Sequence, residues 1–206
     1  MIALIDYGAG NLTSVRKALT AVGAAFETPA TPADLARADG IVIPGVGHFG
    51  ATRAIDAAWR AAILEMVARR MPLLGICLGL QYLFEGSDEA PDAPGLGLLK
   101  GRCRVLPPTV KVPHVGWNAL ATRQKSAILD GVRDGTQVYF THSYAPPITR
   151  AAVATTEHGL RFASAVEQDR IFGVQFHPEK SGDTGLQILR SFVKISKFPT
   201  SQISKW

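Results

Sequence analysis

Cysteine and long apolar stretches are scarce in this chain of 206 residues, which has only two cysteines. One cysteine lies among glycines and the other between two arginines, so we expect no disulfide framework, and a reducing, cytoplasmic setting fits best. No apolar run approaches the roughly 20 residues that cross a bilayer, and residues 1–6 lack the basic region of a signal peptide. We therefore expect neither a membrane span nor secretion.

Basic charge is present but is not concentrated anywhere. The net charge of +5 and the pI near 9.4 come from lysines and arginines scattered along the chain, without a basic cluster interleaved with aromatic residues. Nucleic-acid binding is therefore not expected. A moderate positive field favours encounter with an acidic partner or substrate instead.

The length and the ordinary hydrophobic content of 47% predict one globular domain spanning residues 1–206. The chain has no internal repeat and no low-complexity segment. Its end, residues 198–206, has no clear packing partner and is expected to be loose.

Strands and helices alternate in the first part of the sequence. Buried strands are predicted at residues 2–7, 25–28, 40–44 and 72–76. Helices are predicted after them, at residues 11–22, from residue 31 onward, at 57–70 and at 78–84. This alternation favours an open, largely parallel, flavodoxin-like sheet in a three-layer α/β/α arrangement.

Shorter and less helical segments follow Glu85. Strands are predicted at residues 102–106, 137–140, 151–155, 161–166 and 171–176, with a closing helix at 183–196. Because turn residues separate these short strands, we expect them to extend the sheet in antiparallel fashion.

A cysteine flanked by glycines stands at the turn between a predicted strand and helix. Gly75 and Gly79 lie two residues to either side of Cys77, and side chains there would clash as the backbone reverses, a pattern typical of a nucleophile elbow. The turn places the sulfur near a helix N-terminus, where unpaired N–H groups and the helix dipole favour a thiolate. A small buried core thiol is the alternative.

A cysteine nucleophile needs a base, and the base needs a group that orients it. His177 directly follows an apolar strand that Pro178 ends, and Glu179 points the same way as His177 in an extended chain. One ring nitrogen of His177 is therefore expected to bind Glu179 while the other faces Cys77. The histidines without this arrangement are His48, His114, His142 and His158. For His177 itself, a surface or satisfied loop position is the alternative.

Two glycine-rich loops follow predicted strands. Gly8-Ala9-Gly10 matches the first half of a dinucleotide fingerprint, but Thr13 stands where the third glycine would be, so a tight turn is the alternative. The loop at residues 45–50 lies at a strand's carboxyl end, where open α/β sheets bind ligands. A plain turn, or a phosphate cradle lacking the P-loop lysine, is the alternative for this second loop.

The elbow Gly75-Ile76-Cys77-Leu78-Gly79 and the later His177-Pro178-Glu179 together resemble the class I, or triad, glutamine amidotransferases, over essentially the whole chain. The resemblance implies that Cys77 attacks the side-chain amide of L-glutamine, that His177 is the general acid and base, and that Glu179 orients it. Ammonia then leaves as a thioester forms. Backbone N–H groups that receive the oxyanion agree with this chemistry. Neither a metal nor another cofactor is expected.

Five further stretches are similar to those family members that supply ammonia to a cyclase in histidine biosynthesis. They are residues 6–11, 44–49, 113–118, 142–144 and 177–181. The resemblance implies that the loop Gly45-Val46-Gly47 supplies one N–H of an oxyanion hole and that Leu78 supplies the other. It also implies a heterodimer with a (β/α)₈-barrel cyclase, which receives the ammonia through its core.

The same resemblance names candidate residues for the substrate and the partner. Those implied to hold the amino-acid end of glutamine are Gln81, His142, Ser143 and Tyr144. Those implied at the partner interface are Trp117, Asn118, Tyr139 and Lys180. Glu89 is a candidate for the glutamine ammonium group, with a solvated loop acid as the alternative, and for Trp117 a core position is the alternative. Cys103 departs from any catalytic pattern and is interpreted as structural.

Two other function classes stay open from the sequence. A different triad hydrolase or peptidase on the same scaffold would cleave peptides or esters and ignore glutamine. A non-catalytic nucleotide-binding module would rest on Gly8-Ala9-Gly10 alone. Gln81 and the interface stretches argue against the first class, and the missing third glycine argues against the second.

Overall fold

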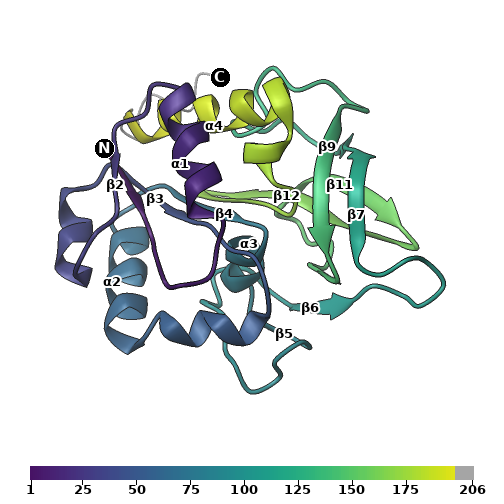
Figure 1. Cartoon of the computed structure of the whole chain (residues 1–206), viewed down its shortest axis with the longest axis horizontal. Coiled ribbons are helices and arrows are strands. Elements are labelled where there is room, and N and C mark those ends of the chain that lie inside the picture. The colour runs from purple at the N-terminus through teal and green to yellow at the C-terminus, as the bar shows by residue number, and fades with distance from the viewer. Residues whose placement is uncertain (198–206) are drawn as a thin grey trace.

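A computed structural model describes residues 1–197 of the chain, so the predicted loose tail lies outside the described residues. Its main sheet has eight strands in the order β2-β1-β3-β4-β13-β12-β11-β8 (Figure 1). Their bounds are β1 Ile2–Leu4, β2 Phe26–Glu27, β3 Gly40–Ile43, β4 Leu73–Ile76, β8 Ala121–Thr122, β11 Ala152–His158, β12 Leu160–Gln168 and β13 Ile171–Val174. Neighbours from β2 to β13 pair in parallel, and β12, β11 and β8 continue the sheet in antiparallel fashion. The predicted sheet is confirmed.

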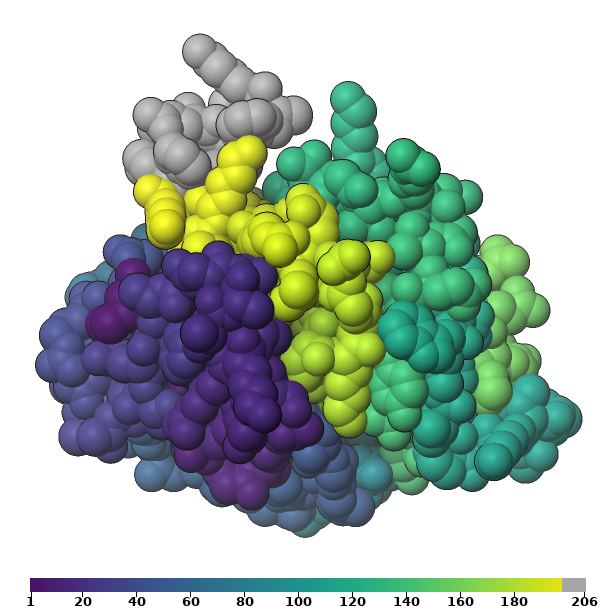
Figure 2. All heavy atoms as spheres, turned by 45° about the horizontal axis from the view of Figure 1, so that its top comes forward, coloured from purple at the N-terminus to yellow at the C-terminus, as the bar shows by residue number. Residues whose placement is uncertain are grey.

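Helices cover both faces of this sheet. They are α1 Leu12–Ala21, α2 Ala57–Ala68, α3 Leu78–Leu83 and α4 Gly182–Lys197, with 3₁₀ turns η1 Pro32–Arg37, η2 Phe49–Ala54 and η3 Pro178–Lys180. Along β3, Val42 packs with α1 and α4 while Ile41 and Ile43 pack with η1, α2 and α3, as the alternation of side chains in a strand requires. Figure 2 shows α4 at the surface between the N-terminal segment and the strand-rich segment. The three-layer arrangement is therefore as predicted.

The first helices begin at residues with capping side chains. Asn11 accepts the N–H of Ser14 at the start of α1, and Asp56 accepts two N–H groups at the start of α2. Thr31 and Asp34 form a capping box, but the turn after Thr31 is a 3₁₀ helix rather than an α-helix. The end of the loop predicted at residues 45–50 also belongs to a 3₁₀ turn, Phe49–Ala54, which His48 caps by accepting the N–H of Gly50.

Two small sheets stand beside the main one. One contains β10 Tyr144–Ala145, β6 Arg102–Val105 and β5 Gly86–Ser87, and the other contains β7 His114–Ala119 and β9 Gln137–His142. The sequence predicted β9 but not β7. Strand β7 contains glycine and asparagine and is only partly buried, so its extended form depends on antiparallel pairing with β9 rather than on local preference.

Strand β13 corrects one prediction. It was grouped with the antiparallel segments, and it does pair that way with β12, but its other neighbour is β4, to which it is parallel. Pairing with a strand almost a hundred residues away leaves no local signal in the sequence. Because β4 and β13 pair in parallel, their carboxyl ends meet at one edge of the sheet.

The two glycines around the elbow are required by close backbone contacts. A Cβ at Gly75 would lie 2.5 Å from the carbonyl oxygen of Gly79, inside the turn itself. A Cβ at Gly79 would lie 1.8 Å from the carbonyl oxygen of Ile43, on the neighbouring strand β3. The predicted clash is confirmed, and for Gly79 it also involves the strand beside the turn.

Replacing Gly79 with alanine is therefore expected to destabilise the fold by at least about 3 kcal/mol, because backbone must move to admit the methyl group. Urea denaturation followed by circular dichroism measures this loss. Gly8→Ala is the comparison: there a Cβ meets nothing within 4 Å, so only the positive φ of +75° costs energy, about 1 kcal/mol. Equal losses in the two variants would contradict the role given to the contact with Ile43.

Candidate active site

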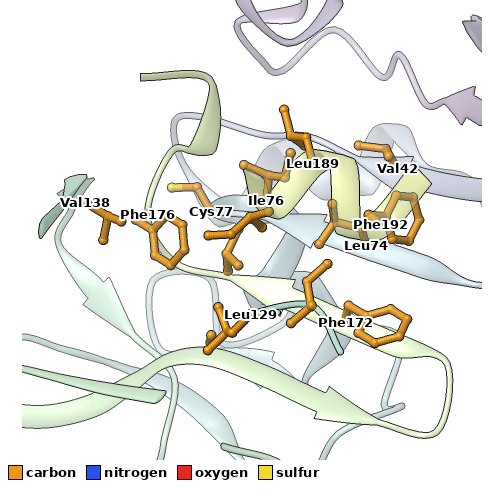
Figure 3. Close-up of a cluster of buried hydrophobic side chains, with 14 of the residues drawn as sticks. Val42, Leu74, Ile76, Cys77, Leu129, Val138, Phe172, Phe176, Leu189 and Phe192 are labelled. Carbon is orange, nitrogen blue, oxygen red and sulfur yellow. The ribbon is translucent and has the colours of Figure 1, made fainter. Parts of the chain in front are cut away.

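Cys77 occupies a strained turn directly after β4. Its φ of 54° and ψ of −105° lie outside the regions that residues other than glycine prefer. Its N–H donates to the carbonyl of Val174 at 2.8 Å. The residue is 5% exposed, and its side chain lies between Phe176 and Ile76 in the apolar cluster that Figure 3 shows. Strain of this kind persists only where neighbouring structure enforces it, and it often marks a functional residue.

His177 reaches the same edge of the sheet from β13. The parallel register pairs Val174 with Ile76, so the residues after these two strands come together. The Nδ1 atom of His177 lies 2.7 Å from Oε1 of Glu179, and the two side chains are only 1% and 2% exposed. Nε2 of His177 is buried without a hydrogen-bond partner among residues 1–197. The predicted pairing of His177 with Glu179 is thus present in the structure.

The pKa of His177 is set by opposing effects. Burial alone would lower the pKa, but interactions with Cys77 and Glu179 outweigh burial and raise it to about 10. At neutral pH these interactions favour the protonated ring, which lies between a sulfur and a carboxylate. This is the protonation state that a proton donor to a leaving amine requires.

Gln175 touches the cysteine sulfur, although the sequence had not singled it out. Its Nε2 donates to Sγ of Cys77 at 3.5 Å, and its Oε1 accepts from Nε2 of Gln81 at 3.1 Å. The second N–H of Gln81 donates to the carbonyl of Tyr144 at 2.8 Å. A signal did exist, because Gln175 is a polar residue in an apolar strand and stands two positions before His177, on the same face.

The loop that follows β3 lies against the elbow. The N–H of Leu78 donates to the carbonyl of Gly45 at 3.4 Å, so in this conformation it is not free to receive an oxyanion. The hydroxyl of Tyr7 donates to the carbonyl of Pro44 at 2.9 Å. A Cβ at Gly45 would lie 2.3 Å from that hydroxyl, so only glycine fits there. Gly47 has a φ of +99° and open space around it.

A pocket of about 230 Å³ opens at this edge of the sheet. It is lined by Gly47, Cys77, Leu78, Gln81, Glu89, Pro113, Thr141, His142, Ser143 and Tyr144. Oε2 of Glu89 accepts the N–H of Phe49 at 2.6 Å, which fixes the carboxylate at the pocket. A larger cleft of about 730 Å³ lies between residues 122–132 and α4, but it contains none of the candidate residues, so chemistry rather than size locates the site.

Comparisons with known proteins agree with this geometry. A family model described as glutamine amidotransferase class-I matches residues 3–195. A protein of Moorella thermoacetica named imidazole glycerol phosphate synthase subunit HisH is 46% identical over 94% of each chain. The HisH subunit of Methanothermobacter thermautotrophicus is also 46% identical, over 95% of this chain and 98% of its own. The chain belongs to the class I glutamine amidotransferases.

A solved structure titled "Crystal structure of glutamine amidotransferase" has the same fold as this amidotransferase. The TM-score is 0.75, the sequence identity is 15%, and the match covers 96% of this chain and 99% of the other. The loop Gly8-Ala9-Gly10 accordingly serves a local purpose: it precedes the cap of α1, and Gly10 lies against Gly45 of the loop after β3.

Three of the four candidate interface residues of the amidotransferase form an exposed cluster, apart from the pocket. Trp117 on β7 is 56% exposed and contacts Tyr139 on β9 edge-on, with ring centroids 6.1 Å apart. Nζ of Lys180 lies 5.7 Å from the centre of the Tyr139 ring. Asn118 differs, because its side-chain amide bonds to His114 and to the carbonyl of Glu157 instead of pointing outward. The core alternative for Trp117 does not hold.

Three further features of the amidotransferase concern its second cysteine, metal ligands and membrane-spanning helices. Cys103 is fully buried, and burial raises its thiol pKa, in keeping with a structural role. Within residues 1–197, no group of three or more His, Cys, Asp or Glu side chains is placed to hold a metal ion. No helix in the same range is long and apolar enough to cross a membrane.

The raised pKa of His177 predicts a pH-dependent stability. In the unfolded chain a histidine titrates near pH 6.5, so between about pH 6.5 and 10 the folded state holds a proton that the unfolded state releases. The stabilisation is complete below pH 6.5 and is lost as the pH rises through 10. We expect the free energy of unfolding to fall across this window, by at most about 1.4 kcal/mol per pH unit.

Urea unfolding at several pH values measures this effect, and His177→Asn is the control because it lacks the titrating ring. Subtracting the two profiles removes the titration of other groups. Identical slopes in the wild type and in His177→Asn would contradict the assignment.

Proposed function

We propose that this chain is the glutaminase subunit of an imidazole glycerol phosphate synthase, acting in the cytoplasm as a single amidotransferase domain. It hydrolyses L-glutamine to glutamate and ammonia, and passes the ammonia to a partner cyclase that forms imidazole glycerol phosphate and AICAR in histidine biosynthesis. The observation that carries the proposal is the meeting of Cys77, His177 and Glu179 at one sheet edge beside a small pocket, in a chain 46% identical to HisH subunits.

In the first chemical step, Sγ of Cys77 attacks, as the thiolate, the side-chain amide carbon of glutamine and forms a tetrahedral oxyanion. The C–N bond then breaks, and His177 gives the proton on Nε2 to the departing nitrogen, which leaves as ammonia. Glu179 holds Nδ1, so only Nε2 is available for this transfer. In the second step, water attacks the thioester carbon while His177 takes up one of its protons. The C–S bond breaks, which releases glutamate and regenerates the Cys77 thiolate beside the His177 imidazolium, and the carboxyl proton of the product passes to solvent.

The oxyanion needs N–H donors that the present conformation does not offer. The N–H of Leu78 is directed to the carbonyl of Gly45. Turning the Gly45–Val46 peptide would remove that acceptor and bring in the N–H of Val46, giving two donors. The open space and positive φ at Gly47 lower the cost of such a rotation. Slow hydrolysis by the isolated chain follows from this arrangement.

The amino-acid end of glutamine is assigned to the far side of the pocket. Glu89 offers the negative charge that an ammonium group requires. Ser143 and Tyr144 also line the pocket, and their backbone is assigned to the carboxylate. Gln81 uses both N–H groups on Tyr144 and Gln175, so its role is to hold this wall in place.

The partner is assigned to the face that carries Trp117, Tyr139 and Lys180. A large exposed tryptophan backed by a tyrosine is the type of residue that dominates the energy of protein interfaces. The expected occupant is a (β/α)₈-barrel cyclase, and docking there would form a heterodimer.

A glutaminase assay of the purified chain, with and without the cyclase and its nucleotide ligand, tests the proposal. Slow hydrolysis is expected alone and much faster hydrolysis in the complex. Cys77→Ser is expected to reduce hydrolysis about a thousandfold or more in both conditions while the fold persists. Cys103→Ala is the matched control, since it removes the other thiol. Undiminished hydrolysis by Cys77→Ser would refute the assignment of Cys77 as the nucleophile. Fast hydrolysis by the isolated chain would refute the dependence of activity on the cyclase.

Replacing Trp117 with alanine is expected to weaken cyclase binding about tenfold or more without changing thermal stability, because the side chain is largely exposed. Calorimetric titration of the cyclase measures the affinity. Arg69→Ala is the control, as it removes an exposed side chain at the C-cap of α2, away from β7 and β9 (Figure 1). Unchanged affinity in Trp117→Ala would place the partner elsewhere.

A further inference from the structure

Three histidines that the proposed chemistry does not use pack together beside the pocket, and one of them, His142, lines it. The ring of His114 stacks on the ring of His158 at a centroid distance of 4.0 Å, and on Phe140 at 4.8 Å. His142 meets His114 edge-on. His114 and His142 lie directly opposite each other on strands β7 and β9, and both are buried. Each ring nitrogen of a buried histidine is expected to have a hydrogen-bond partner, so the partners of these rings must be identified.

A continuous series of hydrogen bonds links these rings to the pocket. Nδ1 of His142 lies 2.9 Å from the carbonyl oxygen of Tyr144, and Nε2 of His142 lies 3.0 Å from Nδ1 of His114. Nε2 of His114 in turn lies 3.3 Å from Nδ2 of Asn118. The series therefore runs from the partner-facing strand β7 to the wall that holds Tyr144.

The position of every proton in this series follows from its two ends. A carbonyl oxygen can only accept, so Nδ1 of His142 carries the proton and its Nε2 is the acceptor. His114 must then donate from Nδ1, which leaves its Nε2 to accept from the amide of Asn118. That amide has one orientation, because Nδ2 also donates to the carbonyl of Glu157 and Oδ1 accepts the N–H of Ala119.

Both rings in the series are neutral. Burial lowers the pKa of His142 to about 3, and the nearby histidines add to this effect against the opposing bond to Tyr144. Burial, and to a smaller extent the electrostatic effect of the neighbouring His158, lower the pKa of His114 to about 4. The tautomers deduced from the hydrogen bonds are therefore the states present at neutral pH.

We propose that His114 and Asn118 are positioning residues, which hold His142 in its Nδ1–H tautomer and thereby fix the Tyr144 carbonyl on the wall of the substrate pocket. That carbonyl accepts from both His142 and Gln81, and Gln81 leads through Gln175 to the sulfur of Cys77. The inference rests on the proposed function insofar as the pocket binds glutamine. None of the three rings takes part in proton transfer to the substrate.

Nuclear magnetic resonance of the full chain labelled with ¹⁵N-histidine tests the tautomers directly. Two-bond ¹H–¹⁵N correlations distinguish Nδ1–H from Nε2–H rings. We expect His142 and His114 both to be neutral Nδ1–H tautomers, with each Nε2 resonance typical of a nitrogen that accepts a hydrogen bond. A proton on Nε2 of His142, or a charged ring at neutral pH, would overturn the proposal whether or not the protein hydrolyses glutamine.

Two substitutions at His114 separate hydrogen bonding from packing. His114→Asn keeps an N–H donor where Nδ1 stands but loses the stacked ring, and His114→Phe keeps the ring but loses the donor. In His114→Phe we expect the KM for glutamine to rise about tenfold, with kcat changing less than about threefold, because the pocket wall is loosened while the triad is untouched. The Nε2 resonance of His142 should move to that of an unpaired nitrogen. In His114→Asn we expect both quantities to stay near the wild-type values.

His158→Phe is the matched control, since it retains a ring on His114 but lies outside the series, and its KM should not change. A KM for His114→Asn no better than that for His114→Phe would show that packing, not the donor, matters, and would overturn the proposal. If His114→Phe does not fold, the tautomers of the wild-type protein and the KM of His114→Asn still test the proposal. Absence of glutamine hydrolysis in the wild type would refute the proposed function alone.

Discussion

The parallel pairing of β4 with β13 is the constraint on which the whole site depends. It aligns Ile76 with Val174, so that the chain leaves both strands at one edge of the sheet and delivers Cys77 and His177 to the same place. The bond from the Cys77 N–H to the Val174 carbonyl continues this pairing into the elbow itself. A shift of register by one residue would turn every side chain of β13 to the opposite face and separate the base from the sulfur.

The strain at Cys77 is tolerable because its surroundings leave little freedom to relieve it. Gly75 and Gly79 let the turn close against β3, and the short helix α3 that follows is buried throughout. The second half of the site is the buried pair of His177 and Glu179. Removing these two groups from water costs free energy, but the hydrogen bond and the opposite charges outweigh that cost. Rigid packing thus supports both halves of the triad.

The sequence could predict what depends on local signals. The glycines at the elbow, Pro178 after a strand and the caps at Asn11 and Asp56 each act within a few residues, and the elements they imply are present. Strand β7, the parallel partner of β13 and the inward turn of the Asn118 side chain were missed, because each depends on a neighbour that is distant in sequence. Gln175 could have been predicted as a site residue, since a polar residue on the His177 face of an apolar strand needs a hydrogen-bond partner.

Most of the candidate site is held in one conformation, and one peptide of it is not. The triad and the wall formed by Gln81, Gln175 and Tyr144 are joined by hydrogen bonds and buried contacts, so moving any one of them would leave a buried polar group unsatisfied. Among residues 1–197, the Gly45–Val46 peptide makes one backbone hydrogen bond, the long one to the Leu78 N–H. It lies between Gly45, which Tyr7 confines, and Gly47, which has open space around it. A change of conformation is therefore cheapest at this peptide, and the oxyanion site that we propose there could change without disturbing the nucleophile.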